Sequence, residues 1–506
     1  MLMDWNLNER LRKSAQTYPN QAAVLFENEK ITYKELKTYV DLVAMNLASS
    51  GIKKGDKVAL VLGNCPEFII SYFGILRAGG VVVPINPIYS QEEISYILIN
   101  SKSKVVIAQF SLETIIVPLM KELKSIDRVY YVESNHVELA WEQLIVDQKS
   151  NVDLPVITED DLAVILYTSG TTGRPKGAML SHKNLCSNAE SIAKLTEFTS
   201  EDRILAVLPM FHIFCMSVCI NAPIICGGTI VISEKFSPID VMQTIMTEKV
   251  TLFAGVPTMY SILLQLVGYS ADHFKTLRVC LSGGASLPVQ VLQRFEEKYK
   301  VNILEGFGCT ETAPVTAFNP LKGIRKVGSV GIDIPGVKNK IVDPNGTEVA
   351  RGEIGELVVK GPNVMIGYLG MPDETTYSIK NGWFHTGDLA KMDEDGYIYI
   401  VDRMKDMIIV GGYNVYPREV EEVLYNHPAI IEAVVIGVPD PIFGEQVKAF
   451  VVRNDHLLST DDLIVFCNQQ LAKYKVPKEI EIMNEMPKNS TGKILRRELR
   501  TYSKTN

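Results

Sequence analysis

Residues 167–177 (YTSGTTGRPKG) concentrate glycines, hydroxyl groups and one lysine in eleven positions. Glycines let backbone N–H groups converge on an anion, while hydroxyls and an ammonium group add further donors. The residues that could contact phosphate in this way are Thr168, Ser169, Gly170, Thr171, Thr172, Gly173 and Lys176. The segment lacks the GxxxxGK[ST] pattern of a Walker loop, so it predicts a phosphate-binding loop of another kind. A surface turn rich in Gly and Thr is the alternative interpretation.

The elements around this loop predict the fold class that must position it. The loop directly follows an apolar run at 162–167, and similar runs at 57–62, 104–108, 204–208, 252–255 and 278–281 are separated by helix-length segments. Capping-box patterns, Thr32 with Glu35 and Ser90 with Glu93, begin two of those segments. Such alternation predicts an α/β fold with mostly parallel, doubly wound sheets. Ligands of these sheets bind beyond the carboxyl ends of the strands.

The pattern changes after about residue 319. Short strands with frequent Gly, Pro and Asn turns predict a β-barrel-like part at about 320–402. From residue 403 onward the pattern predicts a small α+β unit, with helices at 419–425 and 461–471 and strands at 431–436 and 447–452. We therefore expect an N-terminal domain at 1–402 and a mobile C-terminal domain at 403–506.

Composition excludes several classes of protein. The 506 residues are 46% hydrophobic and 22% charged, as in an ordinary globular protein. The formal net charge of −8 argues against nucleic acid as the main partner. Eight cysteines without a CxxC pair argue against a zinc cluster and indicate a reducing compartment. The polar start carries no secretory signal, so we expect a cytoplasmic protein whose membrane contact, if any, is peripheral.

One uncharged stretch, 204–233, raises the alternative of a membrane span. Pro209, His212, Asn221, Pro223 and the glycine pair at 227–228 interrupt it. The longest piece between prolines is too short to cross a bilayer. A buried strand–helix–strand unit is therefore the preferred interpretation.

Five motifs in order resemble the adenylate-forming superfamily of acyl-CoA synthetases, adenylation domains and luciferases. They are the 167–177 loop and the segments 305–311 (EGFGCTE), 383–388 (WFHTGD), 411–417 (GGYNVYP) and 487–493 (PKNSTGK). Within the superfamily, the chain is most similar to bacterial long-chain fatty acid–CoA ligases. The resemblance extends over essentially the whole sequence.

This resemblance implies a nucleotide site. Phe307, where many relatives have tyrosine, would stack on adenine, Thr310 would touch the α-phosphate, and Glu311 would help to hold Mg²⁺. Asp388 and Arg403 would contact the ribose. The full set implied for adenine and ribose is Gly284, Ala285, Glu305, Gly306, Phe307, Gly308, Asp388 and Arg403.

The resemblance also implies roles for the C-terminal segments. Lys493 corresponds to the catalytic lysine, whose charge would stabilise the meeting of a carboxylate with the α-phosphate. Lys405 corresponds to the pivot of the small domain, and Gly411 and Gly412 to the channel for the pantetheine of coenzyme A. The remaining basic residues of the tail, Arg496, Arg497, Arg500 and Lys504, are expected to be solvated.

The acyl site is predicted from a smaller set of residues. His212 falls where the family has an aromatic or histidine side chain near the acyl carboxylate, so a positioning or gating role is expected; an ordinary core histidine is the alternative. Gly283, Gly284 and Gly308 would leave room for an unbranched chain. Residues 209–214 (PMFHIF) lack the aspartate that pairs with an α-ammonium group in amino-acid adenylating domains, which argues against an amino-acid substrate.

These inferences predict an enzyme that ligates a medium- to long-chain fatty acid to coenzyme A through an acyl-adenylate. Its catalytic residues would be Lys493, His212 and Thr310, and it would use ATP, Mg²⁺ and coenzyme A. An aryl acid of the coumarate type, or acyl carrier protein as acceptor, remains an alternative within the class. A non-catalytic acyl-AMP sensor and a phosphohydrolase are alternatives outside it. A homodimer is compatible with the sequence, which does not fix the oligomeric state.

Overall fold

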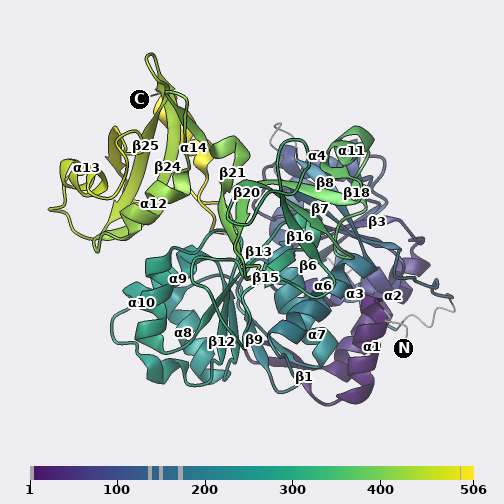
Figure 1. Cartoon of the computed structure of the whole chain (residues 1–506). Coiled ribbons are helices and arrows are strands. Elements are labelled where there is room, and N and C mark those ends of the chain that lie inside the picture. The colour runs from purple at the N-terminus through teal and green to yellow at the C-terminus, as the bar shows by residue number, and fades with distance from the viewer. Residues whose placement is uncertain (1–4, 135–138, 148–151, 169–174, 491, 506) are drawn as a thin grey trace.

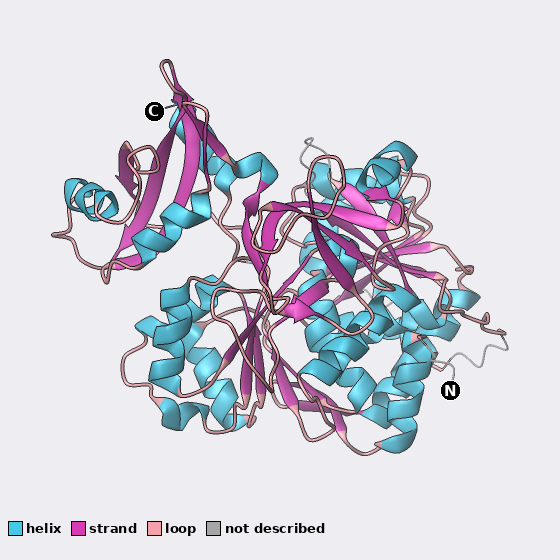
Figure 2. Cartoon of the chain, in the orientation of Figure 1, coloured by secondary structure: helices cyan, strands magenta, loops and turns pink. Residues whose placement is uncertain are grey.

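The computed structural model describes residues 5–134, 139–147, 152–168, 175–490 and 492–505. Figure 1 shows a large lobe, from α1 to β21, and a smaller lobe that carries the C-terminus. We call the elements from β22 to α14 the small lobe. Figure 2 shows that the large lobe alternates helices and strands, whereas the small lobe packs its helices against a single sheet.

A seven-stranded sheet carries the strand that leads into the 167–177 loop. Its order is β18 (Gly367–Tyr368), β8 (Lys176–Ser181), β7 (Leu162–Thr168), β4 (Val81–Pro84), β3 (Lys57–Val61), β5 (Val105–Gln109) and β6 (Arg128–Val132). The strands from β7 to β6 run parallel, and β8 and β18 are antiparallel additions at one edge.

This sheet is covered by helices on both faces. Val58 and Leu60 of β3 belong to the core that includes α2 (Tyr33–Ser49) and α3 (Pro66–Arg77). Ala59 and Val61 belong to a second core with α4 (Gln91–Ser101) and α5 (Glu113–Glu122). Because successive side chains of a strand point to opposite faces, the apolar run at β3 serves both cores.

A nine-stranded sheet forms the other half of the large lobe. Its order is β15 (Ile332–Asp333), β14 (Val315–Phe318), β13 (Ile303–Gly308), β12 (Val279–Ser282), β11 (Leu252–Gly255), β9 (Arg203–Ala206), β10 (Thr229–Ile232), β1 (Ala22–Phe26) and β2 (Glu29–Thr32). Strands β13 to β1 are parallel. Its helices are α1 (Leu7–Thr17), α6 (His182–Leu195), α7 (Ala222–Cys226), α8 (Pro238–Thr247), α9 (Pro257–Gln265) and α10 (Val289–Tyr299). Figure 1 shows α8, α9 and α10 on one side of it and α6 and α7 on the other.

The barrel-like part is a five-stranded antiparallel sheet. Its order is β16 (Lys338–Val342), β17 (Gly355–Lys360), β20 (Trp383–Met392) and β19 (Ile379–Lys380), with β21 (Ile398–Arg403) also paired to β20. The short helix α11 (Pro372–Ser378) precedes β19. The antiparallel part expected from the turn-rich sequence is therefore confirmed.

The small lobe follows β21 through a single turn at Met404–Asp406. It contains β22 (Ile408–Val410), β23 (Tyr413–Val415), β24 (Ile430–Asp440), β25 (Gly444–Arg453) and β26 (Glu479–Ile482), with α12 (Pro417–Tyr425), α13 (Thr460–Asn468) and α14 (Arg496–Thr505). These elements bury a hydrophobic cluster of their own. The α/β class with an added α+β unit is thus confirmed.

Local predictions also agree with the structure. The side chains of Thr32 and Ser90 each accept the N–H of a glutamate three residues on, as a capping box requires. The uncharged stretch forms β9, a buried helical segment at Cys215–Asn221 continued by α7, and β10. Within the described residues, no helix is both long and apolar enough to span a membrane.

The expectation of a solvated basic tail is wrong for two arginines. Arg496 Nη2 donates to Glu421 Oε1 at 2.6 Å, and Arg500 Nη2 donates to Asp406 Oδ1 at 2.9 Å. The reason is that α14 is an amphipathic helix whose Leu499 is buried beside β24. This packing brings its basic face against the carboxylates of α12 and of the turn after β21. Arg497 is exposed, as expected.

Candidate active site

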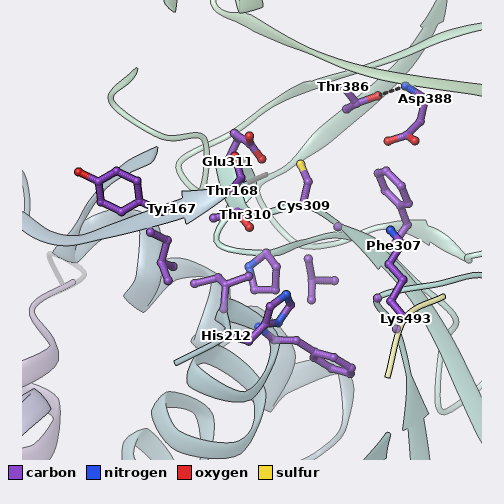
Figure 3. Close-up of a pocket in the computed structure, with 18 of the residues that line it drawn as sticks. Tyr167, Thr168, His212, Phe307, Cys309, Thr310, Glu311, Thr386, Asp388 and Lys493 are labelled. Carbon is purple, nitrogen blue, oxygen red and sulfur yellow. Dashed lines mark hydrogen bonds between the residues drawn. The ribbon is translucent and has the colours of Figure 1, made fainter. Parts of the chain in front are cut away.

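A cavity of about 1080 Å³ lies between the carboxyl ends of the large-lobe strands and the small lobe. Residues from the ends of β7, β12 and β13 line it, as the topology of open α/β sheets predicts. The predicted site residues that line it are Thr168, Lys176, His212, Gly283, Gly284, Gly306, Phe307, Gly308, Thr310, Glu311, Asp388, Arg403, Lys405 and Lys493. Figure 3 shows several of these side chains converging from different elements.

The strand β13 supplies the predicted adenine wall. Gly306 and Phe307 pair with Phe318 and Ala317 of β14, so this end of β13 has an antiparallel neighbour. A Cβ on Gly308 would lie 2.0 Å from the carbonyl oxygen of Pro314, and only glycine permits that approach. The close packing fixes the backbone that leads to Thr310 and Glu311.

Asp388 and Arg403 form an ion pair at the cavity wall. The two residues are register partners on β20 and β21, and Arg403 Nε lies 3.3 Å from Asp388 Oδ1. Burial raises the pKa of Asp388, and the charges of Arg403 and Lys493 oppose that rise. Thr386 Oγ1 accepts the N–H of Asp388 at 3.1 Å, the bond drawn in Figure 3. The arrangement presents a fixed carboxylate to the cavity.

Lys493 enters the cavity from the small lobe, next to Phe307 in Figure 3. Burial, together with the charge of Arg403, lowers the pKa of its ammonium group to about 7. Among the described residues, its Nζ makes no hydrogen bond or ion pair. An ammonium group held in a partly desolvated position without a partner is costly, which indicates a site built to receive an anion.

A second charged group lies across the cavity. Tyr368 Oη donates to Glu311 Oε1 at 2.9 Å, and the ring of Tyr368 lies 5.3 Å from Lys176 Nζ. Lys176 is paired with Glu374 of α11. Burial raises the pKa of Glu311, and the hydrogen bond from Tyr368 opposes that rise. Both lysines of the predicted phosphate chemistry therefore face the same space.

His212 also lines the cavity. Its Nδ1 accepts the N–H of Phe214 at 3.2 Å, which leaves the other ring nitrogen for a ligand. Burial, together with the charge of Lys493, lowers the pKa of His212 to about 4, so the ring is neutral at pH 7. The cavity is also lined by apolar residues, which we call the apolar wall: Ile192, Leu208, Phe211, Ile213, Phe214, Val218, Val256, Leu281, Pro314, Val315 and Phe318.

Some predicted residues lie away from this cavity. Ala285 and Glu305 do not line it. The side chain of Glu305 accepts the N–H of Leu287 at 3.0 Å, and burial raises its pKa to about 7. Gly411 and Gly412 form the turn between β22 and β23, also outside the cavity. Ser169, Gly170, Thr171, Thr172 and Gly173 fall outside the described residues.

Four residues that line the cavity or contact the Lys493 segment carry no sequence motif that could identify them. Tyr368 and Glu374 contact Glu311 and Lys176, as described above. Asn86 and Thr258 contact the segment that bears Lys493: Asn86 Nδ2 donates to Ser490 Oγ at 2.9 Å, and Thr258 Oγ1 donates to the carbonyl of Gly492 at 3.1 Å. Only the tertiary fold brings Tyr368, Glu374 and Asn86 to the cavity and Thr258 to the Lys493 segment.

Comparison with known proteins supports the interpretation of the cavity. The model of the AMP-binding enzyme family matches residues 11–369, and that of the AMP-binding enzyme C-terminal domain matches residues 419–493. A long-chain-fatty-acid–CoA ligase of Bacillus subtilis (strain 168) is 39% identical, over 97% of this chain and 94% of the relative. A feruloyl-CoA synthase of Amycolatopsis sp is 36% identical, over 96% of this chain and 97% of the relative.

The structure is also similar to solved structures. The ATP-bound crystal structure of MatB from Rhodopseudomonas palustris superposes with a TM-score of 0.93, at 34% identity and with 99% of each chain covered. The apo crystal structure of the same protein gives 0.82 over the same coverage. Because sequence identity and coverage are equal, the difference lies in conformation, and the present conformation is closer to the ATP-bound one.

Proposed function

The chain belongs to the AMP-binding enzyme family, and from that premise we propose that it joins a medium- to long-chain fatty acid to coenzyme A through an acyl-adenylate. The family and its relatives show the coarser activity, which is AMP-forming ligation of an acid to coenzyme A. ATP and coenzyme A are its co-substrates. The acid, the cation and the individual residue roles are our proposal.

The observation that supports a fatty acid is the mixed lining of the cavity. It combines the charged residues Lys493, Asp388 and Arg403 with His212 and the apolar residues of the apolar wall. Such a surface suits a hydrocarbon chain whose carboxylate ends among the charged groups.

In the first step, a carboxylate oxygen attacks the α-phosphorus of ATP, forms the acyl–phosphate anhydride and breaks the bond to pyrophosphate. Both reactants are anions, so a cation between them stabilises the developing charge. Lys493 would supply that cation, Asp388 and Arg403 would hold the ribose, and Phe307 would pack on adenine. Neutral His212 would orient the carboxylate through its free ring nitrogen. Positioning and charge stabilisation are the protein's contribution.

In the second step, the thiolate of coenzyme A attacks the acyl carbonyl and displaces AMP. Gly411 and Gly412 lie outside the cavity in the present arrangement, so their role requires movement of the small lobe. We propose that residues 403–506 rotate relative to residues 1–402 about Lys405. The single turn between β21 and β22 and the separate core of the small lobe support such a hinge.

A magnesium ion fits the donors at Glu311. The described residues contain no group of three or more His, Cys, Asp or Glu side chains that could hold a metal. Glu311 is a half-buried carboxylate on the cavity wall. Mg²⁺ is commonly held by one or two carboxylates and by substrate phosphates and water. Glu311 would thus hold an ion that arrives with ATP and neutralises phosphate charge.

An acid panel tests this function. Purified protein would be incubated with ATP, Mg²⁺ and coenzyme A and with acids from acetate to oleate, plus coumarate and ferulate. We expect AMP and acyl-CoA in equal amounts, with the highest kcat/KM for a medium or long fatty acid. A preference for coumarate or ferulate would favour the aryl-acid alternative. ADP as the product would contradict the proposal, and no nucleotide turnover with any acid would favour a sensor.

A further inference from the structure

The loop that carries Lys493 is held on the large lobe by two side chains. The hydroxyl of Thr258 donates to the carbonyl oxygen of Gly492 at 3.1 Å. The amide of Asn86 donates to Ser490 Oγ at 2.9 Å. Each contact joins residues more than two hundred positions apart, and each lies next to the catalytic lysine proposed above.

Thr258 is attached to a rigid part of the large lobe. It is the second residue of α9, and its neighbour Tyr260 is fully buried. Tyr260 Oη donates to the carbonyl of Leu281 at 2.7 Å, at the end of β12 just before the Gly283–Gly284 turn. The hydroxyl of Thr258 is thus held in a fixed position relative to the cavity wall.

Hydrogen bonds within the loop fix the position of Lys493 relative to Gly492. Asn489 N donates to Lys493 O, Lys493 N donates to Asn489 Oδ1, and Gly492 N donates to Asn489 O, each at 2.9 Å. Gly492 has φ of +82°, and a Cβ there would lie 3.0 Å from Thr258 Oγ1 and 3.1 Å from Val256 Cγ2. Glycine is required both for the backbone angle and for the close approach.

Bringing Lys493 into the cavity has an energetic cost. Its ammonium group leaves water, and no described residue accepts a hydrogen bond from it. Before an anion is bound, contacts between the lobes must offset this cost. The bonds made by Thr258 and Asn86 are such contacts, and they exist only while the small lobe has the present orientation.

We propose that Thr258, with Asn86 as a second anchor, is a positioning residue that holds the Lys493 loop in place for adenylation and has no part in thioester formation. The inference rests on the proposed function, since it assumes that Lys493 serves only the first half-reaction. A hydrogen bond between neutral groups changes an equilibrium by about 3- to 10-fold. Loss of the hydroxyl should lower the adenylation rate by that factor.

The test compares Thr258→Val, which removes the hydroxyl and keeps the shape, with the matched control Thr258→Ser, which keeps the hydroxyl. Adenylation is measured as palmitate-dependent exchange of pyrophosphate into ATP. Thioester formation is measured from supplied palmitoyl-AMP and coenzyme A. We expect Thr258→Val to lower exchange about 3- to 10-fold and to leave thioester formation within about twofold of wild type. Thr258→Ser should retain both activities.

Two further variants separate positioning from general damage. Ser490→Ala removes the acceptor of the Asn86 bond and should lower exchange alone, in the same direction. On a Lys493→Ala background, Thr258→Val should cause no further loss of exchange, because there is no lysine left to position.

Several results would overturn the inference. The inference would be wrong if Thr258→Val exchanged pyrophosphate into ATP at the wild-type rate. It would also be wrong if Thr258→Val lost the same factor in adenylation and in thioester formation. A full additional loss on the Lys493→Ala background would show that Thr258 acts without Lys493. A wild-type protein that exchanges no pyrophosphate with any acid would contradict the proposed function itself, whereas an active wild type with an unaffected Thr258→Val would contradict this inference alone.

Discussion

Arg403 Nε lies 3.3 Å from Asp388 Oδ1, and the two residues face each other in register on β20 and β21. The pairing has an electrostatic consequence. Burial raises the pKa of Asp388, and the neighbouring guanidinium group favours the ionised form. A carboxylate that is kept ionised in this way can accept hydrogen bonds from the two hydroxyls of a ribose.

Asp388→Asn should therefore make the enzyme less efficient with ATP as substrate. The amide keeps the shape but loses the charge that accepts both hydroxyl protons. We expect kcat/KM for ATP to fall by about 10- to 100-fold, the range for lost hydrogen bonds to a charged group. Steady-state AMP release at varied ATP measures this. Asp395→Asn, at an exposed carboxylate in the turn after β20, is the control and should match wild type. If Asp388→Asn had the same kcat/KM for ATP as the wild type, the proposed contact of Asp388 with the ribose would be refuted.

The rate should depend on pH through Lys493. Its pKa is lowered from the ordinary lysine value to about 7, so the group is a cation below pH 7 and neutral above it. If the cation is required, kcat/KM for ATP falls as pH rises through about 7 and is level below that value. A bound triphosphate favours the charged form, so the fall in kcat should occur at higher pH.

Lys493→Arg identifies the group responsible for this dependence. Arginine stays protonated over the whole range, so its slower reaction should show no fall between pH 6 and 9. A pH profile of pyrophosphate exchange for both proteins makes the comparison. The same fall in the arginine variant would assign the titration to another group.

The apolar wall predicts a change in chain-length preference. Val218 is buried on the helical segment Cys215–Asn221 and lines the cavity. Val218→Phe would fill part of the space for the acyl chain, so kcat/KM for palmitate should fall at least about tenfold while that for hexanoate changes little. Val218→Ala, which adds space, is the control and should retain the wild-type kcat/KM for palmitate. An equal loss for both acids would show that Val218 does not limit chain length.

Part of the site is predictable from the sequence because its residues lie at, or just after, the ends of strands. Thr168 ends β7, Gly283 follows β12 and Phe307 lies in β13, so the sheet itself brings them to one edge. Strand and helix positions were predictable for the same reason, from apolar runs and capping boxes.

The remaining contacts depend on tertiary packing. Tyr368 reaches the cavity because β18 pairs with β8. Thr258 reaches the Lys493 loop because α9 packs on β12 through Tyr260. Arg496 and Arg500 are paired because α14 docks on β24, which an isolated basic segment does not reveal. The place of Gly411 and Gly412 depends on how the two lobes are oriented, which no local pattern encodes.

The most direct test of the account is the effect of Lys493→Ala on the two half-reactions. The cavity combines Lys493 of the small lobe with residues of the large lobe that we propose bind the nucleotide and the acid. Loss of one preorganised charge costs about 10²- to 10³-fold in rate. Palmitate-dependent pyrophosphate exchange should fall by that factor, while thioester formation from supplied palmitoyl-AMP persists. An equal loss in both half-reactions, or no loss in exchange, would contradict the assignment of Lys493 to adenylation.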